Sequence, residues 1–435
     1  MRRAGVCAFL YTLILLVFVS CFGTSDETEV TLEFWSFPNF SSDSKEAGAF
    51  EKSLIRAFEE RYPHIKVNYT LLEYSDGAKR LEEAIEKGSA PDVFYDAPGR
   101  IILFANMGLL SPLDDILATE KPYITVELLS ISRGKDRRTY MYPMHEGAFS
   151  MAFNKEMLED LGLINLLPYK RLDRRWSLEE YERLLRSLRS SLPADKTPGV
   201  FYYKSMAGDQ GTRAFLVNLN GNANLLNEDY SAYTFNTENA VANIAWTERA
   251  IKEGLLLDGK DMSSNDAINM FVESNAAHTI LYSPQLNKLY DGKRNYKGGD
   301  FTPIYMPFPN DSTPPSLEFL AGGACIFNNK DEKRIEAAKL FVSFMGKDEE
   351  WAKKLVSATG GFPASSKIEL EMHDDEILYN SVLQRFFGQY YNNITGFAKM
   401  RESWNEMLKD CISNKKDIKE TLDRFVSNAN NTLRE

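Results

Sequence analysis

The first hundred residues alternate between two periodicities of apolar side chains. Residues 30–35 (VTLEFW) and 65–69 (IKVNY) show the every-second-residue pattern of half-buried strands. Between them, apolar residues of the stretch 47–62 recur every three to four positions, which predicts an amphipathic helix that ends before Pro63. A second helical stretch ends near residue 87. This alternation of strand and helix is typical of an α/β fold with a largely parallel sheet.

The segment GSAPDVFYDAPGR contains a strand followed by a tight turn. The strand is predicted at 93–95 (VFY), and a short helix is predicted over 101–107 after the Ala-Pro-Gly turn. Ligands of open α/β sheets bind just beyond the carboxyl ends of the strands. We therefore expect Tyr95, Asp96 and Arg100 to lie at the mouth of a binding site.

Three other patterns predict local structure. Ser177 precedes a helical stretch and Glu180 follows three residues later, which predicts a capping box at a helix start. Residues 333–344 show the spacing of an amphipathic helix. The apolar run around Cys325 predicts a buried, unreactive thiol.

The N-terminus has the pattern of a secretion signal. Two arginines precede an apolar run over 6–19, followed by Ser20 and Cys21. The run is shorter than the roughly 20 residues that span a bilayer, so a signal peptide over 1–20 is favoured over an uncleaved anchor. The segment FVSC resembles a bacterial lipobox, which implies that Cys21 is lipidated and that residues 21–29 form a polar tether.

Charge and length narrow the class of protein. The net charge of the 435 residues is -11, and removal of the two arginines of the signal takes it to -13. A chain this acidic, with no block of clustered Lys and Arg, is not expected to bind nucleic acid. The length exceeds what one hydrophobic core usually supports, so at least two lobes are expected.

The sequence offers no clear enzymatic or metal-binding motif. Four cysteines and four histidines occur, none with metal-ligand spacing. Neither Gly-x-Ser-x-Gly nor a phosphate-binding loop is present. The paired carboxylates sit in polar runs, which favours solvated surface over acid–base catalysis. We expect no catalytic residue, no metal and no cofactor.

Several motifs together resemble one family. The segments FEERYPHIKV, GSAPDVF, LLSPLDD and YPMHEGAFSMAFNKEML, in this order and spacing, are similar to bacterial extracellular solute-binding proteins of family 1, which feed ABC importers of the maltose-binding and glycerol-phosphate-binding kind. The resemblance runs from about residue 30 to 432. Within it, Ser274 stands where the family has a glycine.

The resemblance implies an α/β, two-lobed periplasmic-binding-protein-like fold of type II, with mixed, mostly parallel sheets flanked by helices and joined by hinge segments. It implies crossings between the lobes near residues 146–150, near 321–324 and after 367. The first lobe would contain 30–145 with 325–368, and the second 146–324 with 369–435. Gly322 and Gly323 suit a hinge, because paired glycines absorb changes in φ and ψ.

Candidate ligand-binding residues come from the predicted mouth loops and from the family positions. Flat aromatic side chains suit sugar rings, and polar side chains at the rim suit hydroxyl groups. The resemblance places ligand contacts at 145–146, in the loop at 282–283, in the second-lobe segment 206–213 and on a late helix. The full set is Trp35, Ser36, Tyr95, Asp96, Arg100, His145, Glu146, Tyr203, Asp209, Arg213, Tyr282, Ser283, Gly322, Gly323, Phe362 and Arg401.

The chemistry of the ligand stays open at this point. If Arg100, Arg213 and Arg401 converge, they suit a phosphate or carboxylate, such as a glycerol phosphate. If they pair with acidic residues, a neutral oligosaccharide is favoured. The aromatic content of 12% favours the sugar.

The expected function is that of a monomeric receptor outside the cytoplasm, lipid-anchored in the cell envelope. It would capture a carbohydrate in the interlobe cleft by hinge closure and deliver it to the permease subunits of an ABC importer. A surface enzyme acting on polysaccharide is an alternative of another class. A third is an adhesin or sensor that keeps the fold without transport.

Overall fold

A computed structural model describes residues 29–41, 46–73, 75–206, 208–310, 312–391 and 394–434. The expected signal peptide, Cys21 and all but the last residue of the expected tether lie outside these residues. In the part of the chain that is described, no helix has the length and apolar composition needed to cross a bilayer.

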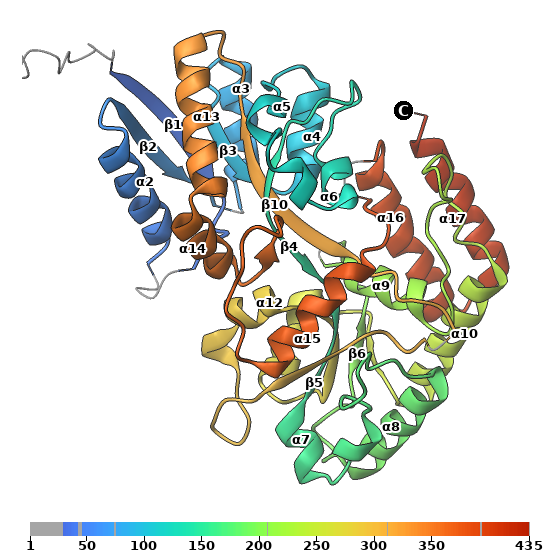
Figure 1. Ribbon diagram of the computed structural model, residues 1–435. Helices are drawn as coiled ribbons and strands as arrows, with labels where there is room; N and C mark the ends of the chain where they lie inside the picture. Colours follow the sequence, from blue (N-terminus) through green and yellow to red (C-terminus); the bar gives the residue numbers. More distant parts are fainter. Residues whose placement is uncertain are drawn as a thin grey trace, which may run out of the picture.

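The larger sheet has six strands in the order β11-β4-β10-β3-β1-β2. Its strands are β1 (Val30–Ser36), β2 (Ile65–Leu71), β3 (Val93–Asp96), β4 (Tyr142–Ala148), β10 (Phe319–Ile326) and β11 (Phe362–Pro363). The helices around this sheet are α2 (Ala49–Arg61), α3 (Gly77–Glu86), α4 (Pro98–Asn106), α5 (Asp114–Leu117), α6 (Val126–Ile131), α13 (Glu332–Lys347) and α14 (Glu349–Thr359). Figure 1 shows them in the upper half of the molecule.

The lower half of Figure 1 is built on two smaller sheets, β8-β5-β9 and β6-β7. Their strands are β5 (Ser150–Asn154), β6 (Val200–Tyr202), β7 (Leu257–Gly259), β8 (His278–Tyr282) and β9 (Pro303–Met306). The helices that pack on these sheets or share their core are α7 (Lys155–Asp160), α8 (Leu178–Ser191), α9 (Gln210–Asn218), α10 (Glu238–Lys252), α11 (Ser264–Val272), α12 (Pro284–Leu289), α15 (Asp375–Leu383), α16 (Phe397–Leu408) and α17 (Ile418–Thr432). In Figure 1, α16 and α17 extend upward along the right-hand side, and we count them with the lower half because of this shared core.

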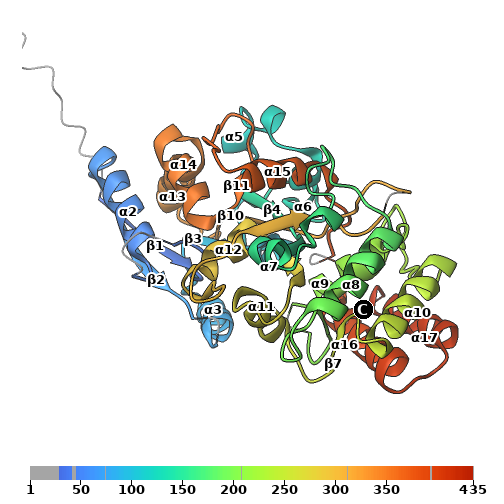
Figure 2. The same cartoon turned by 90° about the horizontal axis from the view of Figure 1, so that it is seen from below.

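Each half has its own hydrophobic core, as expected of a two-lobed chain. The faces of the six-stranded sheet carry two clusters, one against α2, α13 and α14 and one against α3 and α4. The lower half has a single larger cluster, which contains the buried rings of Trp176 and Trp404. The chain crosses between the halves from β4 to β5, before β10 and between β11 and α15. Figure 2 shows the crossing strands β4 and β10 near the middle of the molecule.

The pairing of the strands differs from the expectation of mostly parallel sheets. Parallel pairing occurs between β1 and β2, between β1 and β3, and between β6 and β7. The β10 strand runs antiparallel to β3 and β4, and β11 runs antiparallel to β4. The crossing strands enter the sheet from the opposite end because they pass to or from the other half. The repeated strand–helix pattern of residues 30–95 therefore predicted only the parallel edge.

The boundary between the sheets also differs slightly from the expected lobe limits. Both Ala148 and Phe319 still pair within the six-stranded sheet, and Phe319 and Ala321 pack in its core cluster. The expected limits at 146 and 324 place these residues in the second lobe. The difference arises because β4 and β10 keep their antiparallel pairing for their whole length.

The predicted local features are confirmed. Ser177 and Glu180 form the capping box of α8, and each side chain bonds the backbone N–H of the other. The helix predicted over 333–344 is α13. Cys325 is a free, buried thiol.

Candidate functional site

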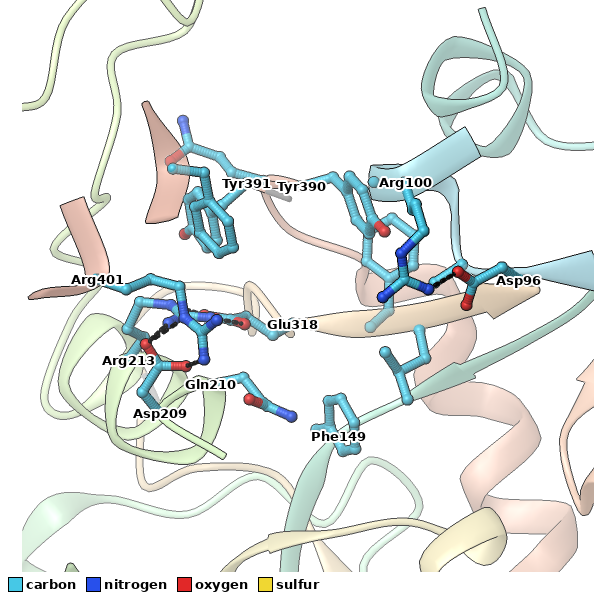
Figure 3. Close-up of a pocket in the computed structure, with 16 residues that line it drawn as sticks. Asp96, Arg100, Phe149, Asp209, Gln210, Arg213, Glu318, Tyr390, Tyr391 and Arg401 are labelled. Atoms are coloured by element: carbon cyan, nitrogen blue, oxygen red, sulfur yellow. Dashed lines mark hydrogen bonds and ion pairs between the residues drawn. The ribbon is translucent and has the colours of Figure 1, made fainter. Parts of the chain in front are cut away.

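The candidate site is a pocket of about 340 Å³ between the two halves. Its wall combines the end of β3, the start of β10, the first turns of α9 and α16, and the segment before α16 (Figure 3). The lining residues are Asp96, Ala97, Gly99, Arg100, Phe149, Asp209, Gln210, Arg213, Glu318, Phe319, Leu320, Gln389, Tyr390, Tyr391, Phe397 and Arg401.

Asp96 and Arg100 form the wall contributed by the upper half. Asp96 ends β3, and Pro98 then starts α4 at a position where a missing N–H costs nothing. Arg100 lies in the first turn of α4, and its side chain forms an ion pair with Asp96 at the end of β3. Burial raises the pKa of the Asp96 carboxyl above its usual value, although Arg100 opposes this shift.

Arg213 is the centre of the opposite wall. Its guanidinium lies between two carboxylates, with Nη1 2.6 Å from Asp209 Oδ2 and Nε 2.8 Å from Glu318 Oε1. A second contact of 2.9 Å joins Nη2 to Glu318 Oε2, so the pair with Glu318 is bidentate. Burial alone would lower the pKa of Arg213, but the charges of Glu318 and Asp209 outweigh burial and raise it.

Arg401 reaches the same cluster from α16. Its Nε donates to Asp209 Oδ2 at 2.8 Å and its Nη2 to Asp209 Oδ1 at 3.0 Å. The ring of Phe397, one turn earlier on α16, lies 5.6 Å from the Arg401 guanidinium carbon and 5.4 Å from that of Arg213. Tyr391 lies 5.7 Å from the Arg213 guanidinium carbon.

The pocket is therefore close to electrically neutral. The three arginines of its described lining face three carboxylates, those of Asp96, Asp209 and Glu318. Gln210, Gln389 and the tyrosines add uncharged hydrogen-bonding groups, and Phe149 and Phe397 add apolar rings. Such a surface suits a polar, uncharged molecule with an apolar face.

Of the sixteen residues proposed from the sequence, the structure brings five together in this pocket. These are Asp96, Arg100, Asp209, Arg213 and Arg401. The other eleven do not belong to its described lining.

The residues proposed at the ends of β1 and β3 mostly face the interior. The Ser36 side chain is fully buried and bonds Tyr69, and Trp35 packs against the cluster near α3 and α4. Tyr95 is fully buried, and its hydroxyl lies 2.7 Å from His145 Nδ1. Burial lowers the pKa of His145 to about 4. Helices cover both faces of this sheet, so neighbouring side chains such as Phe94 and Tyr95, which point to opposite faces, are both buried.

Glu146 is 7% exposed, and burial followed by the charge of Glu127 raises its pKa to about 8. Tyr203 and Tyr282 are core residues of the lower half. The Ser283 hydroxyl accepts a bond from Leu286 N at the start of α12, so it is a helix cap.

The two hinge glycines and Phe362 lie elsewhere in the crossing region. A Cβ on Gly322 would lie 2.2 Å from His145 Cε1, and one on Gly323 would lie 2.2 Å from the Tyr142 carbonyl oxygen. Both glycines thus permit close packing against β4. Phe362 lines a separate, larger groove of about 1400 Å³ beside α12 and α14.

Sequence reasoning missed several lining residues. Phe397 could have been found, because it precedes Arg401 by four residues on the same helix face. The neighbouring aromatics Tyr390 and Tyr391 follow a Gly-Gln pair in an irregular segment, which is a weaker signal. Glu318 and Gln210 carry no local pattern, since tertiary folding alone brings them to the pocket.

The described residues contain no group of three or more His, Cys, Asp or Glu side chains that could hold a metal ion.

Comparison with known proteins identifies the family. The family described as "Bacterial extracellular solute-binding protein" matches residues 41–350 of this chain. The chain belongs to this family. Solved solute-binding proteins share its two-lobed α/β fold.

Two solved structures illustrate the likeness. A Thermotoga lettingae ABC transporter solute-binding protein bound with α-D-tagatose shares 20% identity at a TM-score of 0.72, over 93% of this chain and 100% of that one. The Xanthomonas citri sugar-binding protein MalE shares 13% identity at a TM-score of 0.73, over 93% of this chain and 97% of that one. At sequence identities this low, the similarity shows a shared fold.

Among curated proteins, a putative binding protein of Brucella abortus is 25% identical over 122 residues. The match covers 28% of this chain and 30% of the length of that relative.

Proposed function

We propose that this protein is the solute receptor of an ABC importer and that it binds a neutral carbohydrate in the pocket between its two halves. The observation that carries the proposal is the pairing of each pocket arginine with a carboxylate. A phosphate or carboxylate ligand needs positive charge that is not already neutralised. A neutral saccharide needs uncharged donors and acceptors beside aromatic faces, and the pocket offers both.

Solved structures of the same fold support a carbohydrate ligand. The Thermotoga lettingae protein is bound with α-D-tagatose. A Listeria monocytogenes substrate-binding protein in complex with cycloalternan shares 17% identity at a TM-score of 0.68, over 93% of this chain and 99% of that one.

The proposal includes the cellular setting. The receptor would be held to the membrane through a lipid on Cys21 and would act as a monomer outside the cytoplasm. Its lobes would comprise 30–145 with 325–368 and 146–324 with 369–435, adjusted for the full lengths of β4 and β10. The ligand would favour the closed arrangement because only that form lets it touch both lobes, and the closed receptor would then meet the permease subunits.

The site also argues against the alternative of a polysaccharide-active enzyme. A glycosidase needs one carboxyl group free to donate a proton and a second as nucleophile or base. Asp209 and Glu318 are both held in ion pairs by Arg213, so neither side chain is free to reach a glycosidic oxygen. Burial raises the pKa of Glu318 to about 7, and the charge of Arg213 opposes this shift. We therefore propose binding without chemistry.

A thermal-shift screen tests the proposed function. The purified protein is heated with monosaccharides, oligosaccharides, polyols and glycerol phosphates, and a neutral saccharide is expected to raise the melting temperature by several degrees. A shift with phosphates alone would refute the neutral ligand. Hydrolysis of the bound saccharide, followed by chromatography, would refute the receptor.

A further inference from the structure

Two glycines leave a notch at the edge of the six-stranded sheet. Gly147 belongs to β4, and Gly361 directly precedes β11, the strand that pairs with β4. A Cβ on Gly147 would lie 2.7 Å from Gln285 Oε1, and one on Gly361 would lie 2.6 Å from Gln285 Nε2. Any larger residue would collide with the amide of Gln285. We call Gly147 and Gly361 the glycine notch.

The side chain that fills this notch comes from the other half of the molecule. Gln285 belongs to α12, whose Leu286 packs against the large core cluster of the lower half. The notch belongs to the upper sheet. The contact therefore joins the two lobes beside the crossing from β4 to β5.

A second contact joins α12 to the upper half. Lys288 Nζ donates to the Ser357 carbonyl oxygen at 2.6 Å, at the C-terminal turn of α14. The unpaired carbonyls and the negative end of the helix dipole at this turn favour a cation. Gly360 ends α14 in the left-handed conformation with φ 71°, and a Cβ there would lie 3.2 Å from Gln285 Cα. The end of α14 therefore lies in close contact with α12.

The contact in the notch is incomplete as a polar interaction. Gln285 Oε1 is buried and has no hydrogen-bond partner among the described residues. Burying an unpaired amide oxygen lowers the net gain from seating the side chain. A contact that fits closely in shape but gains little free energy can open and close reversibly.

Gln285, Lys288 and Gly147 do not belong to the described lining of the pocket. We propose that Gln285 in the glycine notch and Lys288 on the Ser357 carbonyl form a latch between the lobes. The latch holds part of the unliganded protein closed. Its effect on solute affinity rests on the proposed function, since apparent affinity rises with the fraction of protein in the binding-competent form. The effect of the latch on lobe opening is independent of the proposed function.

Small-angle X-ray scattering without ligand tests the latch in three variants of the full protein. In Gly147→Ala the three atoms nearest to the new Cβ all belong to the end of the Gln285 side chain, which is flexible, so the notch is filled without a clash against the backbone of the upper sheet at those atoms. The variant Gln285→Ala removes the side chain that fills the notch. The matched control is Gly292→Ala, whose added Cβ has no heavy atom within 4 Å and which needs no positive φ.

We expect a larger radius of gyration for Gly147→Ala and Gln285→Ala than for wild type and Gly292→Ala. The double variant should resemble Gln285→Ala, because both changes remove the same contact. Equal radii for all four proteins, with unchanged circular dichroism, would overturn the latch. If Gly147→Ala misfolds, the radii of gyration of Gln285→Ala and of a further variant, Lys288→Ala, decide whether the latch exists. Lys288→Ala removes the bond to the Ser357 carbonyl oxygen.

Calorimetry with a neutral saccharide from the thermal-shift screen tests the link to affinity. Gln285→Ala should weaken binding about three- to tenfold, through the smaller closed population. If Gln285→Ala has a larger radius of gyration but an unchanged affinity, the link between the latch and affinity is refuted. The effect of the latch on lobe opening would still hold. If no saccharide binds wild type, the proposed function fails while the scattering result still decides the latch.

Discussion

Arg213 has an unusual position for a charged side chain, because it is 1% exposed in the protein interior. Burying one guanidinium is costly unless carboxylates surround it, and Asp209 and Glu318 supply that compensation. The same three groups form one wall of the pocket. Stability and binding-site geometry therefore depend on a single ionic cluster.

Removal of Arg213 should be strongly destabilising. Arg213→Met leaves two buried carboxylates without their shared partner, and we expect a loss of about 3–5 kcal/mol in the free energy of unfolding. Arg424→Met is the control, because its pair with Asp410 lies at the surface and should cost about 0–1 kcal/mol. Urea denaturation of both variants measures the difference, and equal losses would contradict the role given to burial.

Glu146 should make stability depend on pH. Burial raises its pKa to about 8 in the folded protein, so the folded form keeps a proton that the unfolded form releases above about pH 4.5. Its contribution is therefore fully present below pH 4.5 and is lost as the pH rises through 8. Glu146→Gln should remove this loss and be more stable than wild type at pH 9 by on the order of 3 kcal/mol. Urea denaturation of both proteins at several pH values from 4 to 9 measures the free energy of unfolding. If this free energy changes with pH in the same way for wild type and Glu146→Gln, the prediction is wrong.

At the scale of elements, α8 shows how a local signal fixes a helix end. The capping box of Ser177 and Glu180 satisfies backbone donors that the first turn leaves unpaired. We expect Ser177→Ala to lower the free energy of unfolding by about 1 kcal/mol. Ser190→Ala, an exposed position of the same helix, should change it by less than about 0.5 kcal/mol. Similar losses for both would show that the cap contributes nothing specific.

The elements that could be predicted are those whose signal is local. The period of two at 30–35 and the helical spacing of 47–62 gave β1 and α2 to within two residues. Strand direction could not be predicted, because β10 joins the sheet from across the molecule. Ser274 adopts φ 60° where the family has a glycine, and its hydroxyl accepts a bond from Asn154, a contact 120 residues away.

The residues of the candidate site also divide into those with a local sequence signal and those placed by contacts far apart in the sequence. Asp96 and Arg100 were found because they follow a recognisable strand, and Arg401 because a resemblance placed it on a late helix. Glu318 was missed because its role depends on Arg213, 105 residues earlier. The proposed aromatics Tyr95, Tyr203 and Tyr282 are core residues, since an apolar ring at a strand end serves the interior as readily as a cleft.

At the scale of the whole molecule, the net charge of -11 and the near-neutral pocket have different consequences. The acidic surface repels anions at long range, and this repulsion is screened by salt. A neutral saccharide experiences neither the repulsion nor its screening. Inside the pocket, the short ion pairs of Arg213 and Arg401 are partly or fully buried, so salt screens them little.

The affinity for the bound saccharide should therefore be nearly independent of salt. Between 50 and 500 mM sodium chloride, isothermal titration calorimetry should give dissociation constants within about twofold of each other. An anionic solute held by the pocket arginines would lose affinity steadily over this range, because counter-ions compete for the same charges. Sodium sulfate at equal ionic strength is the control for a specific chloride effect. A steady loss in both salts would show that an arginine leaves its carboxylate to bind the solute, which would refute the neutral ligand.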